Sequence, residues 1–102
     1  MDRALKKSRR KVDPRATSEN LVERIRETLL FFGGEAHRRD VIANVARDIG
    51  VDVRNIPEDL ENAMIISFEE TWRDEARRAT YGFHLRFGEG SHRWGLKLAA
   101  AH

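Results

Sequence analysis

The sequence predicts a small α+β domain in which three helices precede a two-stranded β-hairpin. Two observations lead to this prediction. Apolar residues recur at helical spacing over most of residues 18–79, and from residue 81 apolar and polar side chains alternate. The chain has 102 residues, which is the length of one domain.

The first predicted helix follows Thr17 or Ser18, because a hydroxyl at this position can accept a hydrogen bond from an unpaired N–H of the first turn. Its apolar residues form one stripe at helical spacing. The stripe consists of Leu21, Val22, Ile25, Leu29 and Phe32. Gly33 and Gly34 should end the helix, since glycine adopts the positive φ of a helix C-terminus without steric cost.

A short extended piece at residues 35–36 separates this helix from a second one that begins near His37. Asp40 lies in the first turn of the second helix, where a carboxylate is favoured by the positive end of the helix dipole. The buried stripe of this helix consists of Val41, Ile42, Val45 and Ile49. Gly50 should end it, and residues 51–56 then form a connector.

Pro57 suits the first position of a third helical region, because its missing N–H would be unpaired there in any case. Apolar or small residues then recur at every fourth position, namely Leu60, Met64, Phe68, Trp72 and Ala76. The sequence SFEE at residues 67–70 matches a capping box and would start a new helix near Ser67. Residues 57–79 therefore form one helix or two adjoining helices, and the unbroken apolar ladder favours one.

From Tyr81 onward the side-chain pattern has a period of two, which is typical of β-strands. One face of this predicted hairpin is apolar and begins with Tyr81. The residues of this face that should close the core are Phe83, Leu85, Phe87, Trp94, Leu96 and Leu98. The connector FGEGSHR contains two glycines, as hairpin loops often do. Arg86, Arg93 and Lys97 fall on the opposite face, where they are free to meet a polyanion.

Charge is segregated along the chain, although the net charge is only +2. Residues 1–18 hold seven Lys or Arg and two Asp, a net charge of +5. Residues 19–70 hold six Arg and twelve acidic residues, a net charge of −6, and residues 71–102 hold six basic and three acidic ones, a net charge of +3. Residues 1–17 also lack periodicity, so we expect a disordered basic N-terminal arm before a domain at residues 18–102.

The sequence contains no recognisable catalytic or metal-binding motif. It has no cysteine, no phosphate-binding glycine loop, no nucleophile elbow and no zinc-protease motif. The four histidines, which lack metal-ligand spacing, are His37, His84, His92 and His102. No apolar run is long enough to span a membrane, and the basic N-terminus has no apolar signal region. We therefore expect a cytoplasmic protein that is not an enzyme and binds neither cofactor nor membrane.

The order helix, extended piece, helix, helix, hairpin is that of a winged helix-turn-helix domain, with the hairpin as the wing. Within this order, GGEAHRRDVIANVA at residues 33–46 resembles the opening of the second helix in the N-terminal domain of Mrr-type restriction proteins. ARRATYG at residues 76–82 is similar to the helix end before the wing in that family, and Trp94-Gly95-Leu96 to the strand after it. The resemblance covers residues 20–98 and implies DNA binding, but the chain has no room for the nuclease domain of that family.

Four groups of basic residues are candidate DNA contacts, since guanidinium and ammonium groups bind phosphates and base edges. They are Lys6, Lys7, Arg9, Arg10 and Lys11 of the arm, Arg38 and Arg39 at the start of the second helix, Arg73, Arg77 and Arg78 of the third helical region, and Arg86, His92, Arg93 and Lys97 of the wing. Arg73 and Arg77 are four residues apart and should share one helix face. The arm would bind backbone or follow the minor groove.

These features predict a non-catalytic protein that binds double-stranded DNA, as a transcriptional regulator or as a factor of a phage or mobile element. The acidic sequence PEDLEN at residues 57–62 argues against base reading by that segment, because its carboxylates would repel phosphates. The alternative is a winged helix that binds proteins through this acidic face. Its partner would be a basic protein or the basic arm of the chain itself. The arm would act as a docking segment in a homodimer or as an autoinhibitory segment. The arginines at residues 73–78 would then form solvated ion pairs with neighbouring carboxylates.

Overall fold

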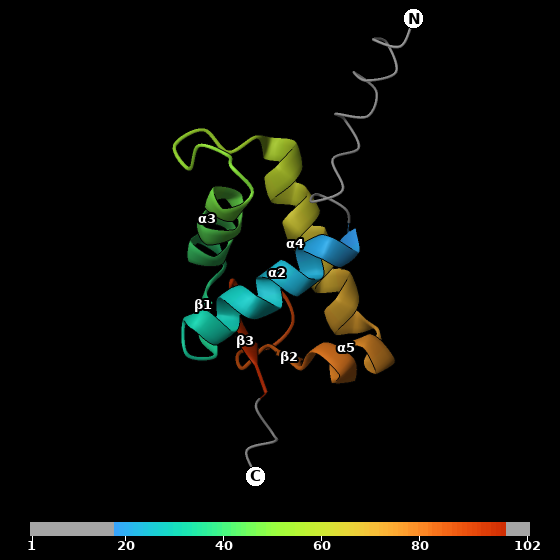
Figure 1. The fold of residues 1–102 in the computed structure, drawn as a ribbon. Helices are drawn as coiled ribbons and strands as arrows, with labels where there is room; N and C mark the ends of the chain where they lie inside the picture. The colour runs from blue at the N-terminus through green and yellow to red at the C-terminus, as the bar shows by residue number, and fades with distance from the viewer. Residues whose placement is uncertain (1–17, 98–102) are drawn as a thin grey trace, which may run out of the picture.

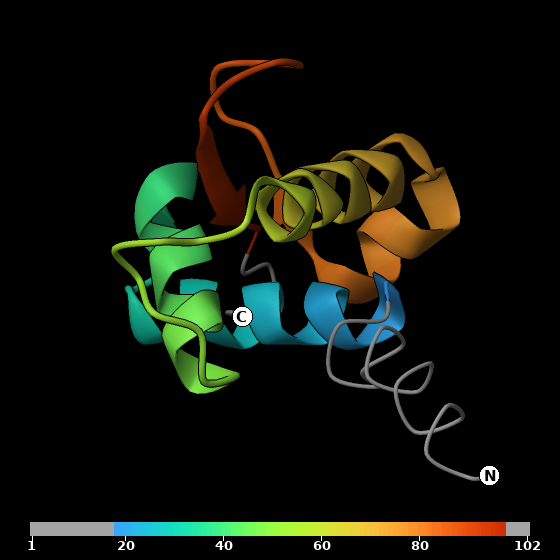
Figure 2. The same cartoon turned by 90° about the horizontal axis from the view of Figure 1, so that it is seen from above.

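Residues 18–97 are described by a computed structural model, and within them the chain forms four helices and a three-stranded antiparallel sheet (Figure 1). The helices are α2 (Ser18–Phe31), α3 (Arg38–Asp48), α4 (Glu58–Arg73) and α5 (Glu75–Tyr81). The strands are β1 (Glu35–His37), β2 (Phe83–His84) and β3 (Arg93–Leu96). Helix α2 contacts α3, α4 and the sheet, and Figure 2 shows α3 and α5 near its two ends. The α+β prediction is confirmed.

Helix α2 ends at the two glycines, as its sequence predicts. The Gly34 N–H donates to the Leu29 carbonyl at 2.7 Å and the Gly33 N–H donates to the Leu30 carbonyl at 3.0 Å, with Gly33 at a φ of 88°. This pair of bonds satisfies carbonyls that the end of a helix otherwise leaves unpaired. Four residues of the predicted stripe are fully buried, namely Leu21, Val22, Ile25 and Leu29. Phe32 lies beyond the helix and is 39% exposed, so its place in the stripe is wrong.

The extended piece after α2 is a strand, and it makes β3 the central strand of the sheet. The strand order is β1-β3-β2, with Ala36 opposite Trp94 in one ladder and Phe83 opposite Leu96 in the other. Gly95 permits this arrangement, because a Cβ there would lie 3.2 Å from the Gly34 carbonyl oxygen. The predicted two-stranded hairpin is therefore part of a three-stranded sheet.

The third helical region is two helices, and the expected continuity across residues 57–79 is wrong. Asp74 has extended backbone angles (φ −86°, ψ 108°), and its carboxylate accepts from the N–H groups of Ala76 at 3.1 Å and Arg77 at 3.2 Å. Asp74 thus caps α5. The capping-box alternative places the break wrongly too, because Ser67 is buried within α4. Pro57 is the extended residue just before α4 rather than its first helical residue.

The core is built on aromatic stacking between α4 and the sheet. The Phe68 ring lies 4.2 Å from the Trp94 ring, with an interplanar angle of 3°, and 4.5 Å from the Phe83 ring. Leu85 and Leu96 are also buried, as predicted.

Of three other residues in the predicted core, two are exposed and one lies outside the described residues. Phe87 is 66% exposed, because β2 ends at His84 and the alternation does not continue to residue 87. Ala76 is exposed on α5, since the helix break turns it away from the ladder. Leu98 lies outside the described residues.

Candidate nucleic-acid interface

The start of α3 is joined to the base of the wing, which we define as residues 85–92 between β2 and β3. The Arg38 N–H donates to the His92 carbonyl at 2.6 Å, and the His37 and His92 rings lie 6.0 Å apart, edge to face. His37 caps α3, with its Nδ1 accepting from the Arg39 N–H at 3.0 Å. Figure 2 shows the wing projecting away from α2. These contacts place Arg38 and Arg39 beside the wing.

Glu35 of β1 pairs with two arginines, Arg86 of the wing and Arg93 at the start of β3. Its Oε1 lies 3.4 Å from Arg86 Nη2 and 3.6 Å from Arg93 Nε. Both guanidinium side chains remain about half exposed, at 59% and 46%, so these pairs orient the arginines more than they stabilise the fold. One carboxylate between two arginines leaves a surplus of positive charge.

The resulting surface, here called the α3–wing edge, gathers five of the predicted contact residues. Its members are Arg38, Arg39, Arg86, His92 and Arg93. Four arginines face two carboxylates, Glu35 and the exposed Asp40 of the first turn of α3. No carboxylate of residues 18–97 lies within 4.0 Å of the side-chain nitrogens of Arg38 or Arg39. The first two N–H groups of α3 are already bonded to His92 and His37, so the guanidinium groups are the part of this edge that can bind phosphates.

The arginines of the third helical region do not join this edge. The break at Asp74 puts Arg73 on α4 and Arg77 on α5, so the expectation that they share one helix face is wrong. The Arg77 guanidinium lies 5.7 Å from the centre of the Tyr81 ring, and that of Arg78 lies 5.1 Å from the Trp72 ring.

Arg73 links α4 to the tip of the wing. Its Nε donates to Glu89 Oε2 at 3.0 Å, and its Nη2 lies 3.9 Å from Glu69 Oε1. Arg86 also stacks on the tip, 4.9 Å from the centre of the exposed Phe87 ring. The sequence does not predict Glu89 as the partner of Arg73, or Glu35 as the partner of Arg86 and Arg93. These carboxylates are distant from the arginines along the chain, and no local pattern marks them.

The exposed face of α4 is acidic. Its exposed carboxylates are Glu58, Asp59, Glu61 and Glu70, and the half-buried Glu69 lies 3.9 Å from Arg73, the single cation of α4. The first three of these residues lie in the first turn, where their negative charges interact favourably with the positive end of the helix dipole. The same charges disfavour the approach of a phosphate backbone to this end of α4.

Other predicted contacts lie apart from the edge or beyond the described chain. Lys97 follows β3, with its N–H donating to the Gly82 carbonyl at 2.7 Å, on the side of the sheet that faces α5. The arm residues Lys6, Lys7, Arg9, Arg10 and Lys11 lie outside the described residues. Within residues 18–97, three or more potential metal ligands do not cluster anywhere. Nor is any helix in that range both long and apolar enough to cross a bilayer.

Comparison with known proteins finds no family model, no curated protein and no solved structure that matches this chain.

Proposed function

We propose that the chain is a winged-helix protein that binds double-stranded DNA without catalysis, through the α3–wing edge and the basic arm rather than through the face of α4. The winged-helix assignment is supported by the strand order β1-β3-β2 and by the position of β1 between the first two described helices. The extra helix α5 between α4 and the wing is a variation on the expected order. The resemblance of residues 33–46 to Mrr-type domains is consistent with this reading.

The observation that carries the proposal is the bond between the Arg38 N–H and the His92 carbonyl, 2.6 Å long. It joins the start of α3, which carries Arg38 and Arg39, to the residue before Arg93, and Glu35 joins Arg93 to Arg86. Guanidinium contacts with phosphates do not depend on base sequence. We therefore expect binding with little sequence preference, and a transcriptional or mobile-element role that depends on partners or on the arm for specificity.

The test is a gel-shift series with a mixed-sequence duplex and the double variant Arg38→Ala/Arg39→Ala. Loss of two phosphate contacts should weaken binding about tenfold and lower the salt slope by about two. The matched control is Arg47→Ala/Arg54→Ala, which removes two exposed arginines that lie outside the edge, at the end of α3 and in the connector before α4. No retardation of the wild-type protein at low salt, or equal losses in both variants, would contradict the proposal.

A second candidate function rests on the acidic face of α4. The four exposed carboxylates of α4 suit a basic protein partner or the basic arm of a second copy. Sedimentation of the full chain and of a chain lacking residues 1–15 tests the second-copy form. If the arm docks on another copy, the full chain will associate in a salt-sensitive manner and the truncated one will remain a monomer.

A further inference from the structure

The ring of Phe87 is exposed at the tip of the wing. Its side chain is 66% exposed, although burial of an apolar ring normally stabilises a fold. The wing that carries it projects away from α2 (Figure 2). Proteins that bind unpaired bases combine cations with aromatic rings on which the bases stack. Phe87 is an aromatic ring of this kind beside the cations of the α3–wing edge.

Two successive turns fix the backbone on both sides of Phe87. The Gly88 N–H donates to the Leu85 carbonyl at 3.0 Å, and the Ser91 N–H donates to the Gly88 carbonyl at 3.1 Å. The bond from α4 to Glu89 holds the same loop. The backbone of the tip is therefore restricted before any ligand binds, which lowers the entropic cost of binding.

Arg86 covers one face of the Phe87 ring and leaves the other face for a ligand. Its guanidinium carbon lies 4.9 Å from the centre of the ring, while its Nη2 lies 3.4 Å from Glu35 Oε1. Because most of the Phe87 side chain is exposed, the second face of the ring is open to solvent. Insertion between two base pairs would use both faces. Stacking on a single base uses only one, and this geometry favours it.

The charges near the ring suit the phosphates on either side of such a base. Arg86 is 59% exposed and Arg93 is 46% exposed, and both pair with the one carboxylate of Glu35. The carboxylate at the tip, Glu89, is paired at 3.0 Å with an arginine of α4. A base stacked on Phe87 would therefore bring its phosphates to a surplus of guanidinium charge.

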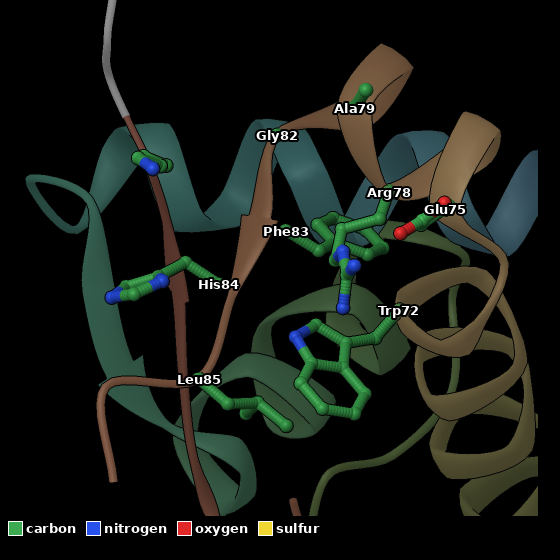
Figure 3. Close-up of a pocket in the computed structure, with 9 residues that line it drawn as sticks. Trp72, Glu75, Arg78, Ala79, Gly82, Phe83, His84 and Leu85 are labelled. Carbon is green, nitrogen blue, oxygen red and sulfur yellow. The ribbon is translucent and has the colours of Figure 1, made fainter. Parts of the chain in front are cut away.

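The ring of Trp72 is not available for stacking in this way. It is half-buried in a pocket of about 640 Å³ between the C-terminal end of α4, helix α5 and strand β2 (Figure 3). The Arg78 guanidinium carbon lies 5.1 Å from the centre of the indole ring. Figure 3 also shows Leu85 beside the indole and Glu75 beside the guanidinium. The indole is thus covered by its neighbours, and the charges of Arg78 and Glu75 balance.

Phe31, at the end of α2, is an exposed ring in the opposite electrostatic setting. Its side chain is 77% exposed, and it borders a hollow that is also lined by Glu27 and Asp48. These carboxylates would repel a phosphate backbone. Phe31 is therefore the matched control for Phe87.

We propose that Phe87 stacks on one unpaired base, so that the protein prefers duplexes containing a base without a partner to intact duplexes. The base would lie on the ring face opposite Arg86. This inference rests on the proposed function, because the guanidinium groups of the edge must hold the duplex. It adds the class of DNA that the wing selects, namely duplexes with a damaged or mismatched position.

The experiment compares two fluorescently labelled duplexes by anisotropy at low salt. They have the same sequence and the same stilbene linkers over their terminal base pairs, but in one of them a central base faces an abasic site. That base leaves the stack at low cost, because it has no pairing to lose. The wild-type protein should bind this duplex about tenfold more tightly, which is the usual size of one stacking contact. Both duplexes carry the same phosphates, so phosphate contacts alone would give equal binding.

Variants separate stacking from other roles of the ring. Phe87→Ala and Phe87→Leu should bind the two duplexes equally, because leucine keeps the apolar bulk of the side chain but not its plane. Phe87→Tyr keeps the plane and should keep the preference. Phe31→Ala should keep it as well. Circular dichroism checks that each variant folds, and the wild-type comparison of the two duplexes requires no variant.

The outcomes distinguish this inference from the proposed function. Measurable but equal binding of both duplexes by the wild-type protein would overturn the inference and leave the proposed function standing. A preference that persists in Phe87→Ala or in Phe87→Leu would overturn it too. Absence of binding to either duplex would contradict the proposed function, and the inference would fail with it.

Discussion

The α3–wing edge and the exposed face of α4 differ in charge, although both are formed by helices of the same small domain. The edge has four arginines against two carboxylates, whereas α4 exposes a row of carboxylates and the single cation Arg73. Even that cation is bound to Glu89 at 3.0 Å. In helix-turn-helix proteins the second helix of the motif reads the major groove, and α4 would take that position here. The order of elements would place DNA on α4, whereas the distribution of charge favours the α3–wing edge, and we propose binding by the edge.

Removal of residues 1–15 should have the largest effect on DNA binding, because it takes away seven basic residues and two aspartates. If five arm cations contact phosphates, the salt slope should fall by about four and the affinity on the order of a hundredfold at physiological salt. Fluorescence anisotropy with a labelled mixed-sequence duplex at several salt concentrations measures both quantities.

A full-length control separates the charge of the arm from its mere presence. Its arm carries glutamine at the five positions Lys6, Lys7, Arg9, Arg10 and Lys11. This variant should bind like the truncated chain. If it keeps the wild-type salt slope, the arm does not act through phosphate contacts and the edge alone must account for binding.

Glu89→Gln should have an intermediate effect. The substitution releases Arg73 from its partner on the wing and removes a negative charge from the wing tip. We expect DNA affinity to rise about threefold at low salt and the gain to vanish at high salt, where exposed charges are screened. The control is Glu70→Gln, which removes the same charge from an exposed position on α4. An equal gain in DNA affinity for both variants would mean that the wing does not contact the duplex more closely than α4 does.

The smallest effect is expected from Glu58→Gln/Glu61→Gln at the acidic start of α4. If this end of the helix lies away from the duplex, the affinity should rise only about twofold, as the change in net charge requires. Glu23→Gln/Glu27→Gln on exposed positions of α2 is the control with the same change in charge. A gain of tenfold in the α4 variant alone would show that its carboxylates lie against phosphates, and would favour docking through α4.

The elements that sequence reasoning found are those with local signals. Periodicity and glycine placement gave α2 and α3 nearly residue by residue, because a helix stripe and its cap are read from neighbouring positions. The break at Asp74 also has a local signal, a capping carboxylate followed by Glu75, but the ladder that continues to Ala76 obscured it. The prediction that Phe87 is buried is wrong because the alternation of apolar and polar residues does not show where a strand ends.

The candidate site was harder to predict than the fold. Each basic residue can be picked out of the sequence by itself, but which of them lie together in space depends on contacts between segments far apart in the chain. Glu35 meets Arg86 and Arg93 only because β1 pairs with β3, and Arg73 meets Glu89 only because the wing folds toward α4. Such contacts follow from tertiary structure, and no spacing in the sequence encodes them. The pocket at Trp72 likewise depends on the helix break that the sequence did not predict.

NMR can decide whether DNA lies on the α3–wing edge rather than on α4. A mixed-sequence duplex is added to the isotope-labelled full chain at low salt, and the shifts of backbone N–H signals are followed. We expect the largest shifts among the described residues at Arg38, Arg39, His92 and Arg93, with little change at residues 58–61. Shifts concentrated at residues 58–61, with the edge unaffected, would contradict it.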